Sequence, residues 1–197
     1  MSKREQINPN KLDIVSGKKG FIISFFIIVL TVIIYYNPIV FEGVTPGGTD
    51  TMAEIGVRHQ VKDFTRETGE QYLWNPAIFC GIPEYFSLNS DAFHIDRLIG
   101  YLRKLHVLDW RISWFILGGI SMFLLLTWLK LPWYYSLTGA LAFLFFPHIQ
   151  GLLMVGHNTK IRALMALPLI LYSFLRFADK RSFFSFALLT LSLSLQF

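Results

Sequence analysis

The sequence predicts an all-α polytopic membrane protein, and three observations support this fold class. Hydrophobic residues make up 53% of the 197 residues, whereas charged residues make up 16%, against about 25% in an average globular domain. The apolar residues gather in runs that approach the roughly 20 residues a helix needs to cross a bilayer. Lys and Arg residues are concentrated on alternate connections between these runs, as transmembrane topology requires. The composition therefore argues against a soluble domain.

Residues 1–19 form a polar, basic tail before the first apolar run, residues 20–41. This run is long enough for the first transmembrane helix, and Tyr35 and Tyr36 stand where its interfacial end is expected. The alternative is a secretory signal peptide, whose apolar core of about 7–15 residues ends in a small-residue cleavage site. The longer run and its Tyr-Tyr-Asn-Pro ending favour an uncleaved anchor.

Residues 42–111 are polar and mixed in charge, and we predict an external loop that contains surface helices. Two sets of apolar residues recur at helical spacing. The first set predicts a short surface helix and consists of Ala53, Val57, Val61 and Phe64. The second set predicts an amphipathic helix in the headgroup plane and consists of Ile95, Leu98, Ile99, Leu102 and Leu105. Between them, Pro76, Gly81 and Pro83 predict a structured turn.

Apolar runs resume in residues 112–197, which are predicted to hold transmembrane helices two to five. Pro147 interrupts the third transmembrane span, residues 134–155. The fourth span, residues 163–178, is short for a crossing. The fifth run stops without a polar flank, so we expect an incomplete helix and an N-terminal part of a longer protein. The predicted bounds are 112–129, 134–155, 163–178 and 182–197.

Basic residues in short loops predict a multi-pass protein with its N-terminus in the cytoplasm. This orientation places most basic residues inside, namely Lys3, Arg4, Lys11, Lys18, Lys19, Lys130, Arg176, Lys180 and Arg181. Lys160 and Arg162 oppose the trend. The net charge of +5 is therefore explained by topology, and we expect no nucleic-acid partner. Cys80 is the single cysteine, which excludes an intramolecular disulfide.

The first candidate site follows the first span. Its Pro-Gly-Gly turn, residues 46–48, precedes a helix that Thr49 or Asp50 can cap. Asp50 and Glu54 fall on one face of this helix. One interpretation is a capping Asp and a Glu that favours the helix dipole. The other is a carboxylate at the membrane surface that acts as a general base or holds a divalent cation.

The second candidate is an aromatic segment rich in Pro and Gly, residues 74–85. Its aromatic side chains, among them Trp74 and Tyr85, suit either the wall of a binding pocket or an anchor at the membrane interface. The sequence leaves both interpretations open.

The third candidate is Gly-His-Asn-Thr-Lys, residues 156–160, on the external side of the third span. A lone His near a helix end is more often simply hydrogen-bonded, but polar residues in membrane segments are candidates for function. Several such residues converge on the external side: Asp50, Glu54, His148, Gln150, His157, Asn158 and Lys160. A cationic Lys160, with His157 and Arg162, suits a lipid-linked phosphate.

These motifs together resemble the start of bacterial YfhO-family membrane proteins, which are similar to GT-C glycosyltransferases. The resemblance runs from Asp50 to Pro168, and its most specific part is the G-H-N-x-K motif. Cys80, where glycine is commoner, and Ile161-Arg162 depart from the family pattern. The matching residues are Asp50, Trp74, Asn75, Pro76, Phe79, Gly81, Pro83, Tyr85, Gly156, His157, Asn158 and Lys160.

The resemblance implies a GT-C-like enzyme of the bacterial plasma membrane that transfers a sugar from a polyprenyl-phosphate carrier to an extracytoplasmic acceptor. It implies that Asp50, with Glu54 beside it, deprotonates the acceptor or binds a metal. Lys160 or His157 would stabilise the departing phosphate. The residues expected to bind substrate are His157, Asn158, Lys160, Trp74, Tyr85 and His148.

Two alternatives to a glycosyltransferase remain open from the sequence. In a transporter or flippase for a lipid-linked substrate, the same polar groups would line a translocation path. In an inactive fragment, the motifs would be vestigial. Consumption of the carrier separates the first alternative from the enzyme, because a flippase leaves the bond between carrier and sugar intact.

Overall fold

The computed structural model describes residues 18–70, 73–76, 80–83 and 109–195 of the chain. The predicted tail up to residue 17 and the amphipathic helix expected around residues 95–105 lie outside this part. The elements, in chain order, are α1 (Lys18–Tyr35), α2 (Asn37–Phe41), α3 (Thr49–Thr68), β1 (Trp74–Asn75), β2 (Ile82–Pro83), α6 (Trp110–Trp128), α7 (Trp133–Leu144), α8 (Pro147–Val155), α9 (Asn158–Asp179) and α10 (Phe183–Ser194).

Four segments of the described chain are helical, apolar and long enough to cross a membrane. The predicted helical architecture is confirmed, and the four segments are compatible with a multi-pass membrane protein. The apolar helix α10 has 12 residues in the described part, so the five-span count stays a prediction. The four segments are Lys18–Tyr35, Trp110–Trp128, Trp133–Val155 and Asn158–Asp179.

The first span ends earlier than the sequence predicts. Instead of running to residue 41, α1 ends at Tyr35 and the short α2 follows. Pro38 has no N–H to donate to the Ile34 carbonyl. The side-chain Nδ2 of Asn37 donates to that carbonyl instead, at 3.0 Å. The proline therefore divides the predicted helix in two.

The fourth span is longer than its predicted bounds, 163–178. The polar segment from Asn158 to Arg162 is helical and begins α9, which has 22 residues. At about 1.5 Å per residue, such a helix is roughly 33 Å long, which is enough to cross the hydrocarbon of a bilayer. The prediction of a short fourth span is therefore wrong, because polar residues open the helix and do not precede it.

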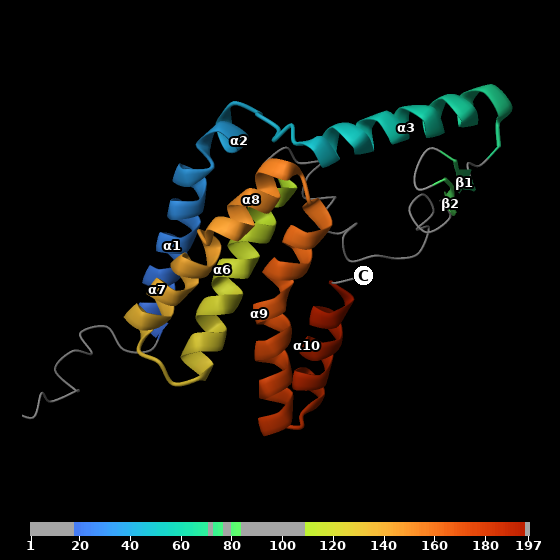
Figure 1. Cartoon of the computed structure of the whole chain (residues 1–197). Coiled ribbons are helices and arrows are strands. Elements are labelled where there is room, and N and C mark those ends of the chain that lie inside the picture. The colour runs from blue at the N-terminus through green and yellow to red at the C-terminus, as the bar shows by residue number, and fades with distance from the viewer. Residues whose placement is uncertain (1–17, 71–72, 77–79, 84–108, 196–197) are drawn as a thin grey trace, which may run out of the picture.

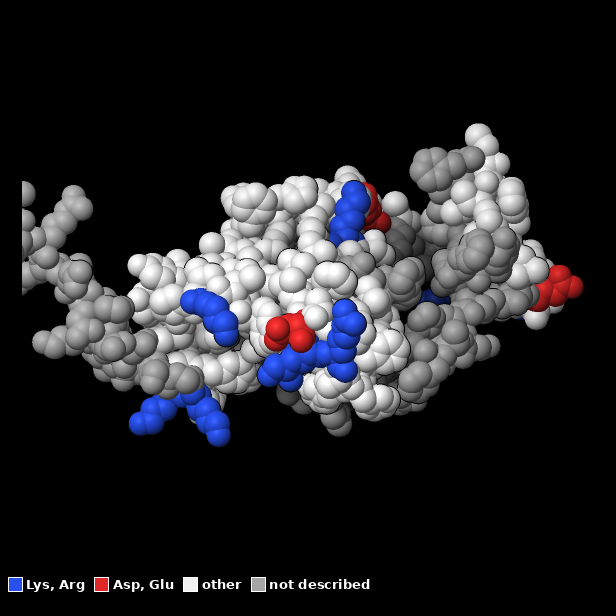
Figure 2. Space-filling model, turned by 90° about the horizontal axis from the view of Figure 1, so that it is seen from below, with Lys and Arg blue, Asp and Glu red and all other residues white. Residues whose placement is uncertain are grey.

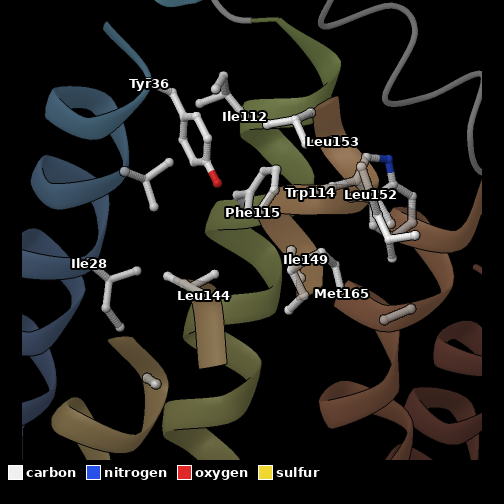
Figure 3. Packing of buried hydrophobic residues seen from close by; sticks show 14 of the residues in the cluster. Ile28, Tyr36, Ile112, Trp114, Phe115, Leu144, Ile149, Leu152, Leu153 and Met165 are labelled. Carbon is white, nitrogen blue, oxygen red and sulfur yellow. The ribbon is translucent and has the colours of Figure 1, made fainter. Parts of the chain in front are cut away.

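Helix α6 lies at the centre of the bundle and packs against α1, α7 and α9 (Figure 1). Two adjacent glycines permit this packing: a Cβ on Gly118 would overlap Met165 of α9, and one on Gly119 would overlap Leu144 of α7. Small residues are common where membrane helices meet, because close packing holds them together. Figure 3 shows most of the buried core, which comprises Ile28, Val32, Tyr36, Ile112, Trp114, Phe115, Phe123, Ala140, Leu144, Ile149, Leu152, Leu153, Ile161, Met165 and Ala166.

The third span is broken between α7 and α8, as Pro147 predicts. The Gln150 side chain seals this break. Its Nε2 donates to the Leu144 carbonyl at 2.9 Å, and its Oε1 accepts from the Tyr36 hydroxyl at 2.8 Å. An unsatisfied backbone group in a bilayer costs on the order of several kcal/mol. Gln150 therefore removes the main penalty of the break and ties it to the end of the first span.

Helix α3 leaves the bundle sideways, at the end where α8 finishes and α9 begins (Figure 1). It has 20 residues, ends at the left-handed Gly69, and buries Val61 on one face. The predicted surface helix is therefore confirmed, and it is longer than expected. Its first turn contacts α8, so this helix is joined directly to the apolar bundle.

The predicted turn between the surface helices is confirmed as a two-stranded hairpin. Trp74 pairs with Pro83 and Asn75 with Ile82 in antiparallel register. Gly81 has φ +128°, and a Cβ there would overlap the Trp74 ring. Glycine is thus required at this position both by the backbone conformation and by the ring that covers it. The hairpin lies near the end of α3 that is remote from the bundle (Figure 1).

We expect Gln150→Leu to lower the free energy of unfolding by about 2 kcal/mol, because the Leu144 carbonyl and the Tyr36 hydroxyl both lose their partner. Tyr36→Phe removes one hydrogen bond and keeps the carbonyl satisfied, so its expected cost is about 0.6 kcal/mol. SDS titration of the protein in mixed micelles measures both values. Equal costs would show that Gln150 does not seal the break.

Candidate functional site

The start of α3 is set by a glycine and not by a polar cap. Gly48 is the N-cap residue, and Thr49 and Asp50 are already helical. The expectation that Thr49 or Asp50 caps this helix is therefore wrong. Gly48 takes the position because its backbone lies against the carbonyl groups of Met154 and Val155, where a Cβ would overlap them. The Asp50 carboxylate is thereby available for a different contact.

A second glycine ends α8. Gly156 has φ +94°, in the left-handed region that favours glycine, and the N–H groups of Gly156 and His157 both donate to the Leu152 carbonyl. A Cβ on Gly156 would overlap the Thr51 hydroxyl. The two turns therefore lock together, with Gly48 against the end of α8 and Gly156 against the first turn of α3.

This packing brings together two of the predicted site residues, Asp50 and His157. The Nδ1 atom of His157 lies 2.5 Å from Oδ2 of Asp50, which is typical of a short, charge-assisted hydrogen bond. The side chains are 34% and 43% exposed, respectively, so the pair is accessible from outside the bundle. When Asp50 accepts the Nδ1–H bond, Nε2 keeps its lone pair for another group.

A carboxylate on Nδ1 is the arrangement that prepares a histidine as a general base. It selects the tautomer, orients the ring and stabilises the imidazolium that forms when Nε2 takes a proton. A second His–Asp pair differs from this one. His59 and Asp63 lie one helical turn apart on α3, with Nδ1 of His59 2.7 Å from Oδ2 of Asp63, and their side chains are 77% and 49% exposed, respectively. Such pairs form on any helix surface by spacing alone, whereas Asp50 and His157 meet only through tertiary packing.

Asn158 and Lys160 lie in the first turn of α9, directly after His157. Asn158 is half-buried and Lys160 is exposed. The first N–H groups of a helix have no intrahelical acceptor and, together with the helix dipole, favour an anion. The Lys160 ammonium group adds a full positive charge to this turn. The start of α9 therefore suits a phosphate next to the histidine.

The other predicted site residues lie elsewhere or outside the described part. His148 is in the first turn of α8, on an exposed face that it shares with Gly151. Trp74 lies in the hairpin, near the end of α3 that is remote from the bundle (Figure 1); α3 is about 30 Å long. Tyr85 and the side chain of Glu54 lie outside the described residues. The structure thus joins Asp50 and His157 and leaves His148 and Trp74 apart from them.

A divalent cation is the alternative that the sequence suggests for Asp50. Among the described residues, no three His, Cys, Asp or Glu side chains are grouped so that they could hold a metal ion. Asp50 and His157 each already use one atom on the other. The described donors therefore do not fit a cation.

The sequence predicts Asp50 and His157 on one side of the bilayer but not the packing that joins them. Gly48, Thr51 and Gly156 make the contact possible, and they carry no acid–base chemistry of their own. In the sequence, the only indication of this contact is a glycine in each of two turns, close to the polar residues Asp50 and His157. A match in shape between two such turns cannot be read from a linear pattern.

We expect Gly156→Ala to lower the free energy of unfolding by about 2 kcal/mol, since a left-handed conformation strains alanine and its methyl group displaces Thr51. Gly151→Ala is the matched control in α8, because a Cβ there meets no atom within 4 Å and alanine favours a helix. Thermal unfolding in detergent compares the two variants. Equal stability would contradict the locked turns.

No protein-family model, curated protein or solved structure matches the chain. The resemblance to the YfhO family therefore rests on the motifs between Asp50 and Pro168. The function of the chain has to be inferred from the contacts that these residues make.

Proposed function

We propose that the chain acts as an integral membrane glycosyltransferase of the GT-C type, related to the YfhO family. It transfers a sugar from a polyprenyl-phosphate carrier to an acceptor outside the cytoplasm of a bacterial cell. The observation that carries the proposal is the Asp50–His157 pair at one end of an apolar bundle. A base at this end suits a lipid-linked donor, because the donor's phosphate lies at the level of the lipid headgroups.

The charge distribution supports an orientation with the pair outside the cell. Figure 2 views the opposite end of the bundle, where several basic side chains and fewer acidic ones lie on a surface of uncharged residues. By the positive-inside rule this end faces the cytoplasm, and α1 begins there. The basic residues at the ends of helices on this side are Lys18, Lys19, Lys130, Arg176, Lys180 and Arg181.

In the proposed reaction, an acceptor hydroxyl attacks the sugar carbon that carries the phosphate. His157 Nε2 takes the hydroxyl proton while the new C–O bond forms and the C–O bond to the phosphate breaks, so the sugar carbon is inverted. Asp50 stays ionised and holds the protonated ring. General base catalysis of this kind contributes about 10²–10⁴-fold to a rate. The geometry thus favours His157 as the base and Asp50 as the residue that positions it.

The departing polyprenyl phosphate keeps the bonding electron pair and gains negative charge. Lys160 and the positive end of the α9 helix dipole stabilise this charge. His157 and Lys160 are three residues apart at the start of one helix, a spacing that puts side chains on the same side. The base and the phosphate site are therefore neighbours, as a displacement between two bound substrates requires.

The broken third span is the feature that favours the alternative, a transporter or flippase. Discontinuous helices form the binding sites of many transporters, where freed backbone groups face the substrate. Here Gln150 occupies the break and hydrogen-bonds to the Leu144 carbonyl. The freed carbonyl is therefore bound within the protein and does not face a path for substrate.

We expect Asp50→Asn and His157→Gln each to lower sugar transfer by about 100-fold or more, because each removes the oriented base. The native protein in membrane vesicles is supplied with a panel of radiolabelled polyprenyl-phosphate hexoses. Release of free polyprenyl phosphate measures the reaction, and the amount of each variant in the membrane is determined by immunoblot.

Asp63→Asn is the matched control, because it breaks the second His–Asp pair of the same helix and should leave transfer unchanged. Normal transfer by Asp50→Asn would refute the assigned role of the pair. Transbilayer movement of an intact carrier, without release of polyprenyl phosphate, would instead identify a flippase. Failure of the wild type to consume any carrier of the panel would also refute the proposal.

A further inference from the structure

Two guanidinium groups lie beside the indole ring of Trp110, where α6 begins. The guanidinium carbon of Arg111 is 5.3 Å from the ring centroid, and that of Arg162 is 5.2 Å from it. Both distances are in the range of cation–π interactions. Arg162 belongs to the first turns of α9, which packs against α6. We call these three residues the arginine–tryptophan cluster.

Arg111 is more than nine-tenths buried and incompletely paired. Only 8% of its side chain is exposed, and its Nε and Nη1 atoms are buried without a hydrogen-bond partner. The Asp109 carboxylate accepts from the backbone N–H of Arg111 at 2.8 Å, but it lies 3.6 Å from Nη1, which is too long for a hydrogen bond. A buried charged donor without an acceptor is strongly unfavourable, so this guanidinium requires an acceptor beyond Asp109.

We propose that the arginine–tryptophan cluster binds the phosphate of a membrane lipid. A phosphate offers several strong acceptor oxygens, and the planar fork of a guanidinium matches two of them at once. A phosphate oxygen would supply the acceptor that the buried Nε and Nη1 atoms of Arg111 lack.

The position of the cluster identifies the phosphate as that of a lipid. Trp110 and Arg111 are the first residues of a helix long enough to span a membrane, which is where headgroup phosphates lie and where Trp is enriched. The neighbours Ile112 and Ile161 are fully buried. The cluster therefore lies at the edge of the apolar core, where a lipid presents its phosphate and keeps its chains in the hydrocarbon.

Two sources share this chemistry: a bilayer phospholipid and a polyprenyl phosphate. The cluster uses residues other than Asp50 and His157, so the inference does not depend on the proposed transferase activity. Arg162 follows His157 by five positions on α9, which places the lipid phosphate on the same end of the bundle as the pair.

The test is retention of lipid by the purified native protein in a neutral detergent, measured by native mass spectrometry. The probes are phosphatidylglycerol, polyprenyl phosphate, and diacylglycerol, which lacks a phosphate. We expect the wild type to retain a phosphate-bearing lipid and not diacylglycerol. Arg111→Gln and Arg162→Gln should each weaken this binding about tenfold or more, as the loss of a charge-assisted hydrogen bond does. The tighter of the two phosphate-bearing probes identifies the source.

Arg66→Gln, in the last turn of α3, is the control for loss of charge and should bind like the wild type. Asp50→Asn should also retain lipid, so failure of the transferase and failure of this site give different results. Circular dichroism checks folding, and if Arg111→Gln does not fold, Arg162→Gln and Trp110→Phe replace it. Equal retention of diacylglycerol, or unchanged binding in Arg162→Gln and Trp110→Phe, would overturn the proposal.

Discussion

The contact between the first turn of α3 and the turn from α8 to α9 is the constraint on which the arrangement at this end of the bundle depends. Gly48 and Gly156 bring two backbones closer together than side chains would allow. Asp50 and His157 meet across this contact, although two segments long and apolar enough to span a membrane lie between them in the chain. The chemistry of the proposed site is thus a consequence of two positions that carry no side chain.

The contact in turn depends on the direction of α8, which is set inside the bundle. A continuous third span would carry Val155 along the axis of α7, whereas the break before Pro147 gives α8 a start of its own. The break is tolerated because Gln150 satisfies the carbonyl that it frees and Tyr36 satisfies Gln150. Hydrogen bonds in the apolar interior therefore determine where the glycine turn at the end of α8 meets α3.

The sequence predicts the features that depend on side-chain hydropathy and loses those that depend on tertiary packing. The second span, predicted as residues 112–129, agrees with α6 to within two residues at each end. The start of α9 at Asn158 is missed, because its polar first turn reads as a loop. Asp50 is expected to cap α3, but the carbonyl groups at the end of α8 leave room only for a glycine at that position. At Gly48, a neighbour distant in sequence therefore decides which residue begins the helix.

The guanidinium and imidazole groups at this end of the bundle suit two different tasks. A guanidinium keeps its proton under physiological conditions, so Arg111 and Arg162 can hold an anion but cannot exchange a proton. An imidazole gains and loses its proton near neutrality, which is the property a base needs. The pairing of histidine with Asp50, and of the arginines with an indole ring, therefore follows from the charge that each group has to carry.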